Sequence, residues 1–72
     1  MLKTYINKRR FVEHELLYLT QRISGEIANI TYEIENDVSE IVTIYFQGGF
    51  ERQVNVTGDS LRLLAIEVLN RI

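Results

Sequence analysis

The sequence contains no cysteine, no proline and no tryptophan, and its only histidine is His14. Without cysteine the chain cannot be held by disulfides, and without a Cys/His cluster we expect neither a structural metal nor another cofactor. A chain of 72 residues buries only about 60% of its unfolded surface, so such small domains often depend on a staple or a partner subunit. The remaining means of stabilisation are a well-packed core and oligomerisation.

Long apolar runs and an export signal are also missing. The apolar runs are only a few residues long, whereas a transmembrane helix needs about 20 apolar residues. Residues 1–7 lack the apolar segment and cleavage site of a signal peptide. Together with the lack of cysteine, this predicts a cytoplasmic protein. No repeat, linker or low-complexity segment divides the sequence, so residues 1–72 are expected to form one domain.

Charge is distributed unevenly, although the net charge is only −2. The first ten residues carry four bases and no acid, and residues 26–40 carry five acids and no base. The basic cluster is the candidate for phosphate contacts in a nucleic-acid-binding protein. The acidic segment predicts a solvated edge that opposes aggregation of sheets. The bases are Lys3, Lys8, Arg9 and Arg10, and the acids are Glu26, Glu33, Glu35, Asp37 and Glu40.

Residues 8–24 have the apolar spacing of an amphipathic helix. Asn7 is a candidate N-cap, although Tyr5 continues the apolar stripe if the helix begins earlier. Ser24 and Gly25 predict the end of the helix, with the glycine in the left-handed conformation. The predicted stripe consists of Val12, Leu16, Leu19 and Ile23.

Residues 28–35 alternate between apolar and polar side chains and predict a half-buried strand. The turn residues Asn36–Glu40 follow, and then residues 41–57 form two more alternating segments around Gly48-Gly49. The predicted inner face consists of Ala28, Ile30, Tyr32 and Ile34 in the first strand and of Val42, Ile44, Phe46, Phe50, Val54 and Val56 in the other two.

The hydrophobic pattern decides the register of the second hairpin. A two-residue loop would place the apolar face of one strand beside the polar face of its neighbour. A three-residue loop over residues 47–49 instead pairs Phe46 with Phe50 and Val42 with Val54, and it predicts a glycine bulge.

Asp59 and Ser60 are N-cap residues and predict a final helix. The chain therefore reads α-β-β-β-α, an α+β domain with a three-stranded antiparallel sheet and both helices on one face. The predicted apolar face of the last helix consists of Leu61, Leu64, Ala65, Val68, Leu69 and Ile72.

No catalytic constellation accompanies His14. Its sequence neighbours Glu13 and Glu15 point to different sides of a helix, so no partner is placed to activate it. The Gly48-Gly49 pair precedes a strand, whereas a phosphate-binding loop precedes a helix. We therefore expect no enzymatic activity.

The order of elements resembles that of double-stranded RNA-binding domains. In that family a lysine cluster opens the last helix, and a loop between the first two strands carries a histidine. Here Gly58-Asp59-Ser60-Leu61-Arg62 stands at the first position and the acidic Asn36–Glu40 at the second. The alternative hypothesis, nucleic-acid binding, therefore depends on the N-terminal bases alone.

Both predicted helices carry more apolar residues than their inner faces need. A helix that is apolar nearly all round is normally covered all round, which predicts contact with a second copy or another protein. The candidate interface residues on the helices are Phe11, Leu17, Tyr18, Leu63 and Ile66, and the alternative surface is the face of the sheet that carries Tyr45.

The segment from Val54 to Ile72 resembles the ends of small accessory proteins encoded by phages and prophages of Gram-positive bacteria. It has the sequence Val-Asn-Val-Thr-Gly-Asp-Ser followed by a short aliphatic helix. The resemblance implies an accessory or regulatory protein. The leading hypothesis is a non-enzymatic protein-interaction module, homodimeric, with no membrane or small-molecule partner.

Overall fold

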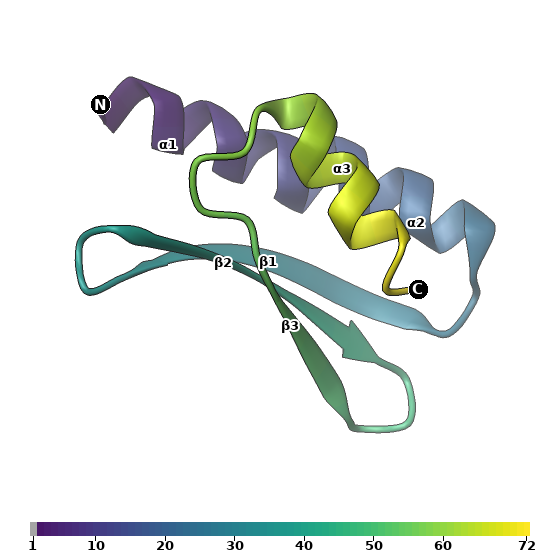
Figure 1. Cartoon of the computed structure of the whole chain (residues 1–72). Helices are drawn as coiled ribbons and strands as arrows, with labels where there is room; N and C mark the ends of the chain where they lie inside the picture. The colour runs from purple at the N-terminus through teal and green to yellow at the C-terminus, as the bar shows by residue number, and fades with distance from the viewer. Residues whose placement is uncertain (1) are drawn as a thin grey trace.

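The computed structural model describes the backbone of residues 2–72 and the side chains of residues 5–72. A long helix comes first, three strands follow, and a short helix ends the chain, which confirms the predicted α+β fold. Both helices lie on the same side of the sheet (Figure 1), so the domain has two layers with one core between them.

The long helix is continuous from residue 2 to residue 23 but is not α-helical throughout. It begins before Asn7, which is therefore an interior residue and not the cap. It ends through an extended Ser24 (φ −138°, ψ 121°) rather than through a left-handed Gly25. Its three parts are α1 (Leu2–Arg10), the π-helix η1 (Phe11–Leu16) and α2 (Leu17–Ile23).

The π-helical segment changes which residues face the sheet. A π-helix closes i→i+5 hydrogen bonds, so each of its turns takes more residues than an α-helical turn. As a result Leu19 and Ile23, both predicted to be in the core, are 50% and 66% exposed. Val12 and Leu16, the first two residues of the predicted stripe, are buried as predicted. The buried positions of this helix are Lys8, Val12, Leu16 and Thr20.

The sheet is antiparallel with the order β1-β2-β3, so β2 is the central strand. The first turn is shorter than predicted, because only residues 36–38 lie outside the strands. Asn36 and Asp37 both have positive φ (54° and 64°), which a type I′ turn requires. The strands are β1 (Ile27–Glu35), β2 (Ser39–Phe46) and β3 (Glu51–Asn55).

A bulge at the start of β1 corrects one predicted core position. The register shifts between Ile27 and Asn29, and the extra residue moves the alternation by one. Ile27 is therefore buried, whereas Ala28, predicted to face inward, is exposed.

The predicted three-residue loop between β2 and β3 is confirmed. Val42 pairs with Val54, and the Phe46 N–H donates to the Phe50 carbonyl at 2.9 Å. Gly49 has φ 92°, as the bulge requires. Phe50, predicted to lie in the core, is 57% exposed, and its ring stacks on that of Phe46 at 4.9 Å.

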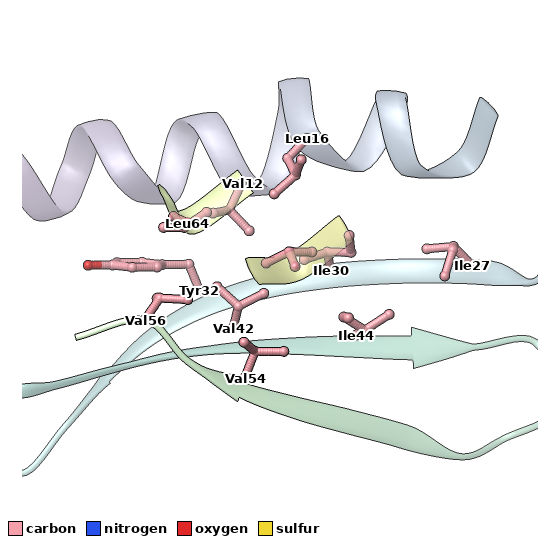
Figure 2. Packing of buried hydrophobic residues seen from close by; sticks show 11 residues of the cluster. Val12, Leu16, Ile27, Ile30, Tyr32, Val42, Ile44, Val54, Val56 and Leu64 are labelled. Carbon is pink, nitrogen blue, oxygen red and sulfur yellow. The ribbon is translucent and has the colours of Figure 1, made fainter. Parts of the chain in front are cut away.

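The last helix, α3 (Leu61–Leu69), begins as predicted after Ser60, whose Oγ accepts a hydrogen bond from the Leu63 N–H at 3.2 Å. It adds the fully buried Leu64 and Val68 to the core. Figure 2 shows this core between the long helix and the sheet. The buried core consists of Val12, Leu16, Ile27, Ile30, Tyr32, Val42, Ile44, Val54, Val56, Leu64 and Val68.

Candidate interaction surface

Lys8 lies inside the domain instead of in the basic surface that the sequence predicts. It is only 7% exposed, and its Nζ lies 2.7 Å from Glu40 Oε1. The same oxygen accepts from the Tyr32 hydroxyl at 2.7 Å, and Glu40 Oε2 accepts from the Gly58 N–H at 2.9 Å. The predictions that Lys8 contacts phosphate and that Glu40 belongs to a solvated acidic edge are therefore wrong, because each neutralises the other in the interior.

The hydrogen bonds of this buried Glu40 network set its protonation. Burial by itself raises the pKa of Glu40, but hydrogen bonds from Lys8, Gly58 and Tyr32 outweigh it and lower the pKa below its ordinary value. Burial, together with the hydrogen bond to Glu40, raises the pKa of Tyr32. At neutral pH the network thus combines a carboxylate with a neutral phenol that donates to it.

Two of the other bases lie within the described side chains. Arg9 Nε donates to the Tyr32 carbonyl at 3.1 Å, and Arg10 is exposed. The side chain of Lys3 lies outside the described residues. The N-terminal segment therefore offers phosphate fewer cationic groups than its sequence suggests.

Side chains of the long helix bind part of the outer edge of β1. Arg9 and Glu13 together bind the backbone of Tyr32, since Glu13 Oε2 accepts from the Tyr32 N–H at 3.0 Å. Further along, Gln21 Nε2 donates to the Ile27 carbonyl at 3.2 Å. These side chains occupy backbone groups that an added strand would need.

The outer edge of β3 has no such cover among residues 5–72. The ladder bonds of Phe50 and Val56 face β2, so antiparallel alternation turns the N–H and C=O groups of every second residue between them toward the open edge. No side-chain hydrogen bond to these groups occurs within the described part of the chain. The residues concerned are Glu51, Gln53 and Asn55, all of them exposed.

Helix α3 exposes much of its apolar surface. Leu63 and Ile66 are 52% and 46% exposed, as predicted from their position opposite the core. Leu61 and Leu69, predicted to be on the inner face, are only partly covered, with 41% and 37% of their surface exposed. Four large aliphatic side chains thus face solvent on a helix of nine residues.

The other candidate interface residues divide into two groups. Tyr18 and Tyr45 are exposed. Phe11 and Leu17, which the sequence predicts in the interface, are instead partly buried and pack against the core. Sequence reasoning missed the exposed residues Leu19, Ile23 and Phe50 by placing them inside.

A hollow of about 440 Å³ lies between α1 and the loop before α3, lined by Asn7, Lys8, Gly58, Asp59, Ser60 and Leu61. Nearby, a hydrogen bond to Asp59, which Glu67 can donate only when protonated, raises the pKa of Glu67. The hollow contains no set of ligands for an ion: no cluster of three His, Cys, Asp or Glu residues occurs in the described chain.

Within residues 2–72, no helix has the length and apolar character to cross a membrane.

Comparison with known proteins adds no relative, since no protein-family model, curated protein or solved structure matches the chain.

Proposed function

We propose that this protein is a non-enzymatic interaction module that forms a homodimer through the exposed face of α3. The observation that supports the proposal is the exposure of Leu63 and Ile66 beside the fully buried Leu64 and Val68 on one short helix. A domain of 72 residues without disulfides gains stability by covering such surface with a second copy.

The charge distribution supports protein rather than nucleic acid as the partner. Nucleic-acid binding draws on clustered, accessible Lys and Arg side chains. Lys8 forms an ion pair with Glu40 in the interior, and Arg9 binds the backbone of β1. A cytoplasmic location and an accessory role of the phage type belong to the same proposal, supported by the cysteine-free composition and by the resemblance of residues 54–72.

Light scattering coupled to size-exclusion chromatography over a dilution series tests the homodimer. We expect a mass twice that of the 8.4 kDa chain at high concentration and a decrease upon dilution. The double variant Leu63→Lys/Ile66→Lys should shift the equilibrium to the monomer, because it places charge in the interface.

Val38→Lys is the matched control, because Val38 is 64% exposed in the turn between β1 and β2, away from α3. It should leave the dimer intact. A wild-type protein that is monomeric at the highest concentration contradicts the proposed function.

A further inference from the structure

The open edge of β3 carries backbone groups that a second strand can bind. Three successive outward positions on this strand, residues 51, 53 and 55, present both a donor and an acceptor, while the corresponding groups of Tyr32 on β1 are occupied by Arg9 and Glu13. We propose that a second copy of the chain adds its β3 antiparallel to this edge, joining the two sheets into one. This inference rests on the proposed function and specifies how the homodimer is built.

The sequence of β3 selects one register for this pairing. A two-fold axis at Gln53 places Glu51 opposite Asn55 of the second copy and aligns all the outward groups, for about six backbone hydrogen bonds. An axis at Glu51 would instead set two carboxylates directly opposite each other, which is unfavourable. The Gln53-centred register therefore uses the full strand without opposing like charges.

The inward-facing side chains fit the same arrangement. Arg52 comes to lie opposite Val54 of the second copy. Its guanidinium does not point across the seam, because Nη1 donates to the Arg71 carbonyl and the group lies 5.7 Å from the centre of the Phe46 ring. The arginines are thus held by their own subunits.

The C-terminal end of α3 lies on the side of the molecule that this pairing covers. The bond between Arg52 and the Arg71 carbonyl places that end of the helix over β3. Leu69, the last residue of α3, lies two residues before Arg71 and is 37% exposed, so exposed apolar surface lies near this flank. Joining the β3 edges brings this flank of α3 toward the same flank of the second α3, so strand pairing and helix contact form one continuous interface.

Single-cysteine variants of the full chain test the register, since the protein has no cysteine of its own. In the proposed dimer the two Gln53 Cα atoms are about 5.5 Å apart, within the range for a disulfide. Gln53→Cys should therefore form a disulfide-linked dimer much faster than Glu33→Cys, an exposed position on the covered β1 side.

Glu51→Cys is the register control. The two copies of residue 51 are offset by four residues, or about 14 Å, so Glu51→Cys alone should not crosslink. Mixed with Asn55→Cys, it should yield the heterodimer. Equal crosslinking of Gln53→Cys and Glu33→Cys contradicts this pairing.

Gln53→Pro gives a second measurement, because it removes an outward N–H that the native ladder does not use. Its circular dichroism should match the wild type while its dimer dissociates at least tenfold more readily. A folded Gln53→Pro protein that dimerises like the wild type overturns the β3 pairing but leaves dimerisation through α3 intact. A monomeric wild type overturns both proposals.

Discussion

Glu40 connects three parts of the chain that are distant in sequence. Its carboxylate binds Lys8 from α1, Tyr32 from β1 and the Gly58 N–H from the loop before α3. A buried carboxylate with these three groups around it is stable only while its partners remain, because an unpaired buried charge is strongly unfavourable. This one side chain thus fixes the first helix and the last loop against the sheet.

Glu40→Gln should lower the free energy of unfolding by about 3–5 kcal/mol, because it leaves the Lys8 ammonium buried without a counter-ion. Urea denaturation followed by circular dichroism measures the effect. Glu35→Gln, at an exposed position near the end of β1, is the control and should change stability by less than about 0.5 kcal/mol. Equal effects in the two variants would contradict the role assigned to Glu40.

The same group predicts a dependence of stability on pH. The pKa of Glu40 is lowered in the folded state, so its contribution is complete above the pKa of an unfolded glutamate, roughly 4.3. It is lost as the pH falls from there through the lower folded-state pKa. The free energy of unfolding should therefore decrease in acid. In Glu40→Gln this decrease should be smaller than in the wild type, and an identical pH profile would refute the assignment.

Glycine is required at two positions and not at a third. Gly49 and Gly58 have φ of 92° and 77°, so alanine at either should cost about 1–2 kcal/mol of stability from backbone strain alone. Gly25 has neither a positive φ nor a close neighbour, and Gly25→Ala is the control. Thermal unfolding of the three variants should separate Gly25→Ala from the other two.

At the level of elements, the long helix both covers the core and occupies part of the β1 edge. Its buried residues face the sheet, while Arg9, Glu13 and Gln21 reach around to the backbone of β1. Arg9 and Glu13 are four residues apart and so lie on one side of the helix. Gln21 reaches the same strand from α2. Among the described side chains, none binds the outward backbone groups of β3, so β3 is the more open edge of the sheet.

Glu13→Ala should destabilise the domain by about 1–3 kcal/mol, because the Tyr32 N–H loses its acceptor. Glu15→Ala, at an exposed position on the same helix, controls for the loss of a negative charge and for the change in helix propensity. Hydrogen exchange should also show faster exchange of the Tyr32 amide in Glu13→Ala only. If Glu15→Ala destabilises the protein equally, the cover of β1 is not the cause.

The elements were predictable wherever a local pattern sufficed. The β2–β3 loop followed from the pairing of Val42 with Val54, because only one register keeps the apolar residues on one face. The phase of the long helix was not predictable, since nothing in the spacing of Leu19 and Ile23 signals a π-helical segment. The bulge that exposes Ala28 likewise exists only in the pairing of β1 with β2.

At the scale of the whole molecule, apolar surface and hydrogen-bonding backbone remain open on the side of α3 and β3. If a second copy covers them, folding and association are coupled, and stability depends on protein concentration. The midpoint of thermal unfolding should therefore rise with concentration for the wild type. It should be constant for Leu63→Lys/Ile66→Lys, and a constant midpoint in the wild type would contradict coupling.

The candidate surface was only partly predictable. Leu63 and Ile66 were identified because both lie opposite the core on a regular α-helix, where position in sequence gives position on the surface. Lys8 was misplaced because its partner, Glu40, is 32 residues away. Composition shows a charge but not whether the fold brings an opposite charge to it.

The sequence by itself determined the order of helices and strands, the hairpin register and the cap at Ser60, because each depends on residues close together along the chain. Tertiary structure decided that Lys8 is buried, that Leu19 and Phe50 are exposed, and that side chains of the long helix bind the backbone of Tyr32 on β1. These outcomes depend on contacts between distant segments, where the free energy of a side chain is set by its neighbours in space. The absence of cysteine excluded a disulfide, and the fold left one apolar flank and one strand edge open to a second copy.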